Sequence, residues 1–137
     1  MNIVNFLIQE WILVSLLVVF AGFYFYREKV TSGQSISPSQ LTLLVNKDLA
    51  TIVDIRPPAE FKLGHLINAL NIPYEKVNSQ LEELEKHKTK TIILVDKLGQ
   101  YTGTVGKMLM QKGFQVKRLS GGITEWQQQN LPLIKSK

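Results

Sequence analysis

Short apolar runs alternate with stretches of helical periodicity along most of this 137-residue chain. The clearest run is TIILV at 91–95, and an acid, Asp96, follows it directly. Such a run is typical of a strand buried on both faces of a parallel sheet, and the residues after its loop repeat apolar side chains at helical spacing. Alternating strands and helices predict an α/β domain with a mainly parallel central sheet flanked by helices.

The predicted elements follow one another closely. We expect strands at 51–54, 69–72, 91–95 and 115–119. We expect helices at 38–46, 58–63, 78–87, 104–111 and 123–129. Ser37 is the expected N-cap of the first helix, with Pro38 at its first position. Ser79 and Glu82 lie near the start of the 78–87 helix and suggest a capping box there.

Asp96 occupies a special place in such a sheet. Ligands of open α/β sheets bind at the carboxyl ends of the strands, so a polar side chain that ends a strand is a candidate functional group. The loop that follows, DKLGQYT, holds Asp96, Lys97, Leu98, Gly99, Gln100, Tyr101 and Thr102. We expect this loop to form the candidate site.

The amino-terminal segment predicts a membrane anchor over residues 1–29. Residues 11–26 hold no charge and, with the more mixed residues 3–9, approach the roughly 20 residues that span a bilayer. Trp11, Tyr24 and Tyr26 lie at the ends of the segment, as interfacial aromatic residues do. Three alternatives are a cleaved signal peptide, a buried soluble helix and an interfacial helix. The first lacks a basic start, and the last lacks a basic face.

The charges that flank this segment predict its orientation. Arg27 and Lys29 follow it, whereas Glu10 is the charged residue before its uncharged core. The positive-inside rule then places the amino terminus outside and the remaining domain in the cytoplasm. Residues 30–35, polar and rich in serine, predict a flexible linker, followed by a domain at 36–134 and a tail at 135–137.

Composition excludes some chemistry and suggests partners. The chain has no cysteine, which excludes disulfides, thiolate metal sites and any persulfide on its own sulfur. No metal and no cofactor are expected. The net charge of +5 favours an anionic membrane surface, which the anchor would also bring close. The lysines of KHKTK and KGFQVKR accompany no nucleic-acid motif, so we expect solvated faces and no nucleic-acid partner.

Two series of residues resemble the rhodanese-like domain family across residues 36–134. The first, similar to the family's Asp-x-Arg, Glu-Phe, Gly-His and Ala-x-Asn-Ile-Pro series, holds Asp54, Arg56, Glu60, Phe61, Gly64, His65, Ala69, Asn71, Ile72 and Pro73. The second, similar to the family's closing Leu-x-Gly-Gly segment, holds Leu119, Gly121, Gly122, Trp126, Leu131 and Pro132. With its apolar start, the whole chain resembles the small membrane-anchored rhodanese-like proteins of the bacterial inner membrane.

The resemblance implies a lost reactive group. In active rhodaneses this loop begins with a cysteine that takes sulfane sulfur from a donor, and the loop amides stabilise negative charge there. Asp96 stands at that position, and Tyr101 stands where an arginine is common. A carboxylate oxygen cannot carry a transferable sulfane sulfur, so the resemblance implies an inactive homologue. Asp96 could occupy the loop amides as an internal ligand, and while it is ionised it would also repel an external oxyanion from them.

Most other matching residues are expected to be structural. Asp54, Arg56 and Glu60 carry opposite charges close in sequence, which typically fix a loop. Gly64, Gly121 and Gly122 suit tight turns or close backbone approach. His65 has no nucleophile or second ligand beside it, and Trp126 suits packing of the last helix on the sheet.

Three functions remain after this reading. The first is a catalytically inactive adaptor that binds a protein partner at the cytoplasmic face of the membrane. The second is a sensor of small anions or metabolites that uses the residual loop. The third is a structural partner of other membrane proteins, assembled through Ser15, Ala21 and Gly22 of the span. Catalysis by Asp96 as a nucleophile lacks the further acids that would hold magnesium.

Overall fold

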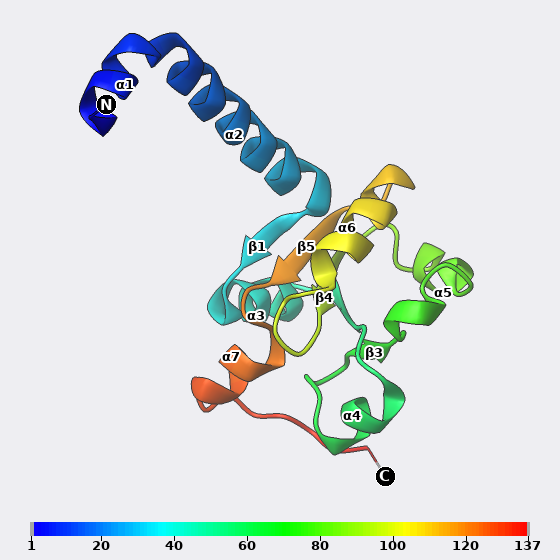
Figure 1. The fold of residues 1–137 in the computed structure, drawn as a ribbon. Coiled ribbons are helices and arrows are strands. Elements are labelled where there is room, and N and C mark those ends of the chain that lie inside the picture. The colour runs from blue at the N-terminus through cyan, green and yellow to red at the C-terminus, as the bar shows by residue number, and fades with distance from the viewer. Residues whose placement is uncertain (1, 137) are drawn as a thin grey trace. The chain divides into compact units, whose positions relative to one another are not determined.

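The computed structural model describes residues 2–136, without the side chains of residues 28 and 29. The chain divides into two compact units, residues 1–30 and residues 31–137. Each unit is described by itself (Figure 1). The charge of Lys29, which contributes to the predicted orientation, lies outside the described residues.

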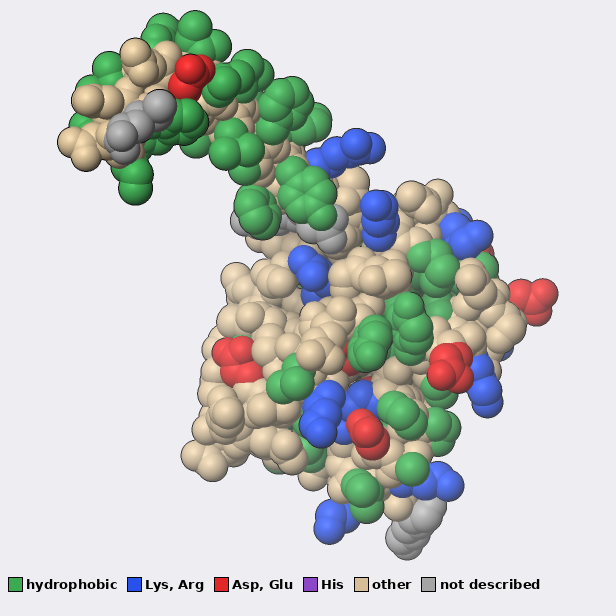
Figure 2. Space-filling model, in the orientation of Figure 1, with side chains coloured by type: hydrophobic (Ala, Val, Ile, Leu, Met, Phe, Trp, Pro, Cys, Tyr) green, Lys and Arg blue, Asp and Glu red, His purple; other side chains and the backbone are tan. Residues whose placement is uncertain are grey.

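The first unit is helical and highly exposed. Helix α1 spans Ile3–Gln9, and α2 spans Trp11–Ser32. The apolar segment is therefore divided at Glu10, whose charge separates the mixed start from the uncharged run. Among the described residues, only α2 is long and apolar enough to cross a membrane. At about 1.5 Å per residue, its 22 residues match a hydrocarbon core of roughly 30 Å. Figure 2 shows hydrophobic side chains over most of α1 and α2.

The second unit contains a parallel five-stranded sheet, which confirms the predicted fold class. Its strands lie in the order β1-β5-β4-β2-β3, and every neighbouring pair is parallel. Their bounds are β1 Gln34–Ile36, β2 Ala50–Asp54, β3 Leu70–Asn71, β4 Thr91–Val95 and β5 Val116–Leu119.

The linker prediction for residues 30–35 is wrong. Helix α2 continues to Ser32, and Gln34 and Ser35 belong to β1, which pairs with β5 in the register Gln34↔Lys117 and Ile36↔Leu119. The physical reason is that β5 would otherwise present an open edge. The side chain of Arg118 also donates from Nε to the Gly33 carbonyl at 2.9 Å.

Helices cover both faces of the sheet. Their bounds are α3 Pro38–Asn46, α4 Pro58–Leu63, α5 Leu81–Glu85, α6 Thr102–Gln111 and α7 Gly122–Gln128, with a 3₁₀ turn at Tyr74–Lys76. The predicted 78–87 helix is thus only five residues long. Ser79 does not cap it, because the Ser79 hydroxyl donates to the Lys76 carbonyl at 2.9 Å.

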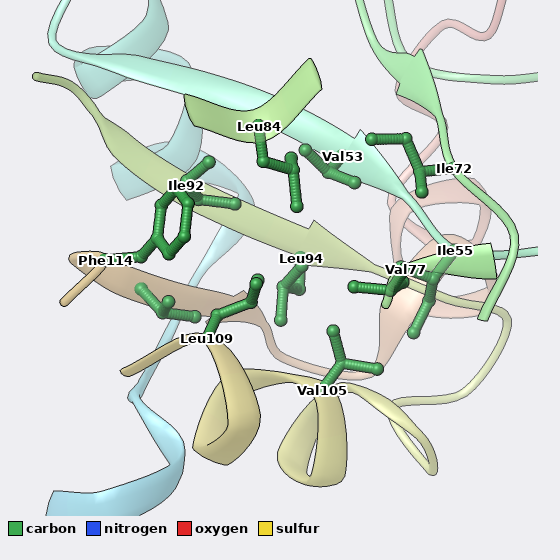
Figure 3. Packing of buried hydrophobic residues seen from close by; sticks show 11 residues of the cluster. Val53, Ile55, Ile72, Val77, Leu84, Ile92, Leu94, Val105, Leu109 and Phe114 are labelled. Atoms are coloured by element: carbon green, nitrogen blue, oxygen red, sulfur yellow. The ribbon is translucent and has the colours of Figure 1, made fainter. Parts of the chain in front are cut away.

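Alternate side chains of β4 enter two separate cores. Ile92 and Leu94 belong to one cluster with Val105 and Leu109 of α6, which Figure 3 shows from close by. Ile93 and Val95 belong to the other cluster, with Leu41 of α3 and with Ile123 and Trp126 of α7. The two-residue period of a strand explains this division. The two cores hold β4 from both faces, and Asp96 follows this strand directly.

The start of α3 gives a first prediction. Ser37 accepts from the Gln40 amide at 3.2 Å, and the Gln40 side chain accepts from the Ser37 amide at 2.9 Å, which completes the predicted N-cap. We expect Ser37→Ala to lower the free energy of unfolding by about 0.5–2 kcal/mol. Urea unfolding followed by circular dichroism measures this, with exposed Ser39→Ala in the same helix as the control. Equal losses in both variants would contradict the capping role.

Candidate functional site

The candidate site lies at the carboxyl ends of the strands. Asp54 ends β2 opposite Val95, the last residue of β4, so Asp96 follows at the same edge of the sheet. The Ile55 amide donates to the Val95 carbonyl at 2.9 Å, which continues the pairing beyond the strands. Asn71 of β3 pairs with Asp54 from the other side. Three neighbouring strands therefore deliver polar residues to one edge.

Asp96 holds the β4–α6 loop together through both of its carboxylate oxygens. It is 4% exposed. Its Oδ1 accepts from the Gly99 amide in a short hydrogen bond, and its Oδ2 accepts from the Tyr101 amide at 2.8 Å. Gly99 has a φ of +92°, a conformation that favours glycine. The structure therefore shows Asp96 as an internal ligand of the loop, which the sequence had allowed.

The β5–α7 turn fixes the backbone of the same loop. The amides of Ile123 and Thr124 donate to the carbonyls of Asp96 and Lys97 at 2.9 and 3.0 Å. Gly122, with a φ of +61°, lies so close that an added Cβ would meet both carbonyls, at 2.7 Å from the Lys97 oxygen. Gly121 also has a positive φ, of +70°. The paired glycines therefore allow two loops to meet at the site.

Asp54 and Arg56 form a buried ion pair beside the loop. The Arg56 Nε donates to Asp54 Oδ1 and Oδ2 at 3.0 and 3.1 Å, and its Nη2 donates to Oδ2 at 2.7 Å. The same Nη2 donates to the Gly64 carbonyl at 2.6 Å. Within the described residues no ion pair joins Arg56 to Glu60, so of these three charged residues only Asp54 and Arg56 form a pair. The Asp54 carboxylate is the counter-charge of the Arg56 guanidinium instead.

His65, Gly64 and Trp126 contact the carboxyl-terminal segment. His65 Nδ1 lies 2.8 Å from the Phe61 carbonyl, and its ring stacks on that of Phe61 at 3.8 Å. His65 also forms an antiparallel bridge with Ile134, and a Cβ on Gly64 would meet the Leu133 side chain at 3.3 Å. Trp126 Nε1 donates to the Pro132 carbonyl at 3.0 Å. These contacts anchor the chain end and leave His65 5% exposed.

A pocket of about 580 Å³ opens beside the loop. It is lined by Ile55, Arg56, Pro57, Glu60, Pro73, Tyr74, Glu75, Asp96, Lys97, Leu98, Gln100 and Tyr101. Thr102 is buried, with its hydroxyl 3.5 Å from the Gly99 carbonyl, and does not line this pocket. A smaller pocket of about 270 Å³ shares Arg56, Glu60 and Lys97 with it. Among the described residues no group of three His, Asp or Glu side chains is placed to hold a metal ion.

Sequence reasoning missed Tyr74 and Glu75. Both residues line the pocket because β3 pairs with β2, so that the residues after β3 lie at the same edge of the sheet as Asp96. The Tyr74 and Tyr101 rings have centroids 5.0 Å apart. The available signal was the position of Tyr74 directly after Pro73, at the end of a predicted strand.

These features define the class of the domain, a parallel α/β domain whose carboxyl-edge loop folds around one side chain. A solved rhodanese-related protein from Thermoplasma volcanium shares the fold, with a TM-score of 0.68 and 24% identity, over 74% of this chain and 98% of that chain. The sequence profile of the rhodanese-like domain matches residues 37–129. The protein belongs to the rhodanese-like domain family.

Two curated relatives extend the comparison. The uncharacterised protein YibN of Escherichia coli strain K12 is 35% identical over 93% of this chain and 88% of its own length. A protein named sulfurtransferase from Allochromatium vinosum is 29% identical over 66% of this chain and 84% of its own length. Because it covers 93% of this chain, the similarity to YibN includes part of the amino-terminal unit, which lies outside the family match at residues 37–129.

The hydrogen bonds of Asp96 give a second prediction. Asparagine retains one carbonyl oxygen, so Asp96→Asn leaves one of the two amides facing another donor. We expect the free energy of unfolding to fall by about 1–3 kcal/mol, measured by urea unfolding of the full chain in nonionic micelles. Asp48→Asn is the matched control, because the Asp48 side chain is 84% exposed and forms an ion pair with Lys90 at the surface. An unchanged stability for Asp96→Asn would show that the carboxylate does not hold the loop.

Proposed function

We propose that this protein is a membrane-anchored rhodanese-like domain that transfers no sulfur through its own residues and binds a protein partner at the cytoplasmic face of the membrane. The observation that carries the proposal is the loop around Asp96, at the position where the family resemblance expects cysteine. Both carboxylate oxygens accept loop amides, and the chain contains no cysteine to replace the missing thiol. The fold is retained while the group that would form a persulfide is absent.

The same hydrogen bonds count against a sensor of small anions. An incoming oxyanion would have to displace a carboxylate from the Gly99 and Tyr101 amides and would meet its charge. The pocket beside the loop is open instead, and Leu98 and Tyr101 line it with side chains that are 51% and 54% exposed. Exposed hydrophobic residues gathered around a pocket often mark an interaction site, and tyrosine is enriched among the residues that contribute most to protein binding.

Helix α2 supports the membrane location, and the charge after it supports the orientation. Helix α2 has the length and hydropathy of a single span. Only Gly33 separates α2 from β1 along the chain, so a spanning α2 would keep the domain within reach of the membrane surface. Arg27 follows the uncharged run, and the positive-inside rule then favours a cytoplasmic domain.

Site-specific photo-crosslinking in native membranes tests the binding function. A photoreactive residue replaces Leu98 in one chain and Leu43 of α3 in another, since both side chains are about half exposed, at 51% and 54%, and only Leu98 lines the pocket. We expect a discrete protein adduct from position 98 and none from position 43. The adduct should persist when an unrelated span replaces α2, which separates the adaptor from a partner of the span. Identical products from both positions, or none, would contradict the proposal.

The orientation is tested with the same chain. Because the native sequence has no cysteine, Lys135→Cys introduces a single thiol in an exposed position. A membrane-impermeant maleimide should label it only after the cells are lysed. Labelling in intact spheroplasts would place the domain outside the cytoplasm.

A further inference from the structure

The pocket beside the Asp96 loop has an aromatic wall. Tyr74 and Tyr101 come from segments that follow β3 and β4, and their rings are tilted by 47° with centroids 5.0 Å apart. Both side chains are exposed, as is Leu98 beside them. Figure 2 shows acidic and basic side chains next to hydrophobic ones on the face of the domain that it presents. Two exposed tyrosine rings therefore line the pocket together.

The charged residues that line this pocket favour a cation. Arg56 is neutralised by Asp54, which meets its guanidinium with both oxygens. Two exposed carboxylates then remain, from Glu60 and Glu75, against the ammonium of Lys97, and the buried Asp96 carboxylate adds a third negative charge beneath the loop. Glu60 and Glu75 are exposed at the surface, and neither forms an ion pair within the described part of the chain.

We propose that this pocket binds a cationic side chain, an arginine or lysine of a partner polypeptide, between the Tyr74–Tyr101 wall and the carboxylate of Glu75. The inference rests on the proposed function and names the chemistry of the partner. A guanidinium stacks on aromatic faces and pairs with a carboxylate, so both features of the pocket suit it. A volume of about 580 Å³ holds one long side chain with its neighbouring residues. An anionic side chain would face the carboxylates of Glu60 and Glu75, with Lys97 as the only pocket-lining lysine to pair with it.

The proposed location supplies such partners. Cytoplasmic segments next to membrane spans are enriched in lysine and arginine, and a membrane anchor would keep such segments within reach of this domain. The domain as a whole is basic, but charges farther away than a Debye length of about 8 Å are largely screened at physiological salt. The local carboxylates therefore decide which side chain enters the pocket.

Nuclear magnetic resonance titration of the full chain in nonionic micelles tests the proposal. Three capped heptapeptides of glycine and serine carry arginine, glutamine or glutamate at their centre. We expect the arginine peptide alone to shift the amide signals of Glu75 and of residues 98–101. Glu75→Gln and Tyr101→Leu should each weaken its binding roughly threefold to tenfold. Glu82→Gln removes an exposed carboxylate of α5 outside this pocket and should leave the affinity unchanged.

Other results would overturn the proposal. Preferential binding of the glutamate peptide would show that Lys97 selects the occupant. Arginine-peptide binding that survives both Glu75→Gln and Tyr101→Leu, with the variants still folded by their dispersed spectra, would place the cation elsewhere. Concentration-dependent shifts of the same signals without peptide would identify a second copy of the chain as the occupant. If no peptide binds while the Leu98 adduct still forms, the cationic chemistry is wrong and the adaptor remains; if the adduct is absent, the adaptor itself fails.

Discussion

Asp54→Ala is expected to lower the free energy of unfolding by about 3–5 kcal/mol, because it leaves a buried guanidinium without its counter-charge. Asp54 is fully buried, and its carboxylate accepts from the Arg56 backbone amide as well as from Nε and Nη2 of the side chain. Arg56 Nη2 also donates to the Gly64 carbonyl, but this oxygen is uncharged and cannot replace the carboxylate. Urea unfolding of the full chain in nonionic micelles, followed by circular dichroism, measures the loss.

Two controls isolate the ion pair. Asp48→Asn removes the charge of a surface pair with Lys90 and should cost no more than about 1 kcal/mol. In the double variant of Asp54→Ala with Arg56→Met, the unpaired charge is removed, so the loss should be smaller than the sum of the single losses. A loss for Asp54→Ala no larger than that for Asp48→Asn would mean that the Asp54–Arg56 pair is solvated.

Gly122→Ala is the second large expected effect, with a loss of about 2–5 kcal/mol in the free energy of unfolding. A φ of +61° strains any L-residue, and the new Cβ would also press against the Asp96 and Lys97 carbonyls. The two loops of the site would have to separate, which breaks the hydrogen bonds from Ile123 and Thr124. The signals of residues 96–101 should therefore change most in a nuclear magnetic resonance spectrum.

Gly113→Ala is the matched control for this substitution. Its φ is +88°, but the nearest atoms to a new Cβ belong to the flexible Lys88 side chain, at 3.6 and 3.7 Å. It isolates the backbone strain, about 1–2 kcal/mol, from the steric contact. If both variants lose the same stability, the close approach of the two loops is not rigid.

The sequence predicted correctly those helices and strands whose bounds depend on neighbouring residues alone. The strand at Thr91–Val95 and the helix at Pro58–Leu63 have the expected bounds, because a purely apolar run and a Pro-Pro start leave few other conformations. The 78–87 helix is shorter than its charged, helix-favouring residues suggest. A turn before it, closed by the Gln80 amide on the Lys76 carbonyl at 3.0 Å, replaces its first part.

Tertiary contacts explain the remaining differences. Residues 34–36 form β1 because β5 offers an edge, which no pattern within this polar stretch reveals. The position of Asp96 was predictable from the apolar run before it, but the two amides that it binds depend on how the loop closes. Tyr74 and Glu75 join the pocket through the pairing of β3 with β2, far from the loop in sequence.

The most direct test of the account is a thiosulfate:cyanide sulfurtransfer assay on the full chain in nonionic micelles, beside Asp96→Cys. We expect the rate with the native protein to equal that of the blank without protein, because the sequence contains no cysteine. The variant should gain a persulfide, detected by mass spectrometry as one added sulfur atom, because the Gly99 and Tyr101 amides can stabilise the thiolate. Sulfur transfer by the native protein above the blank would contradict the account.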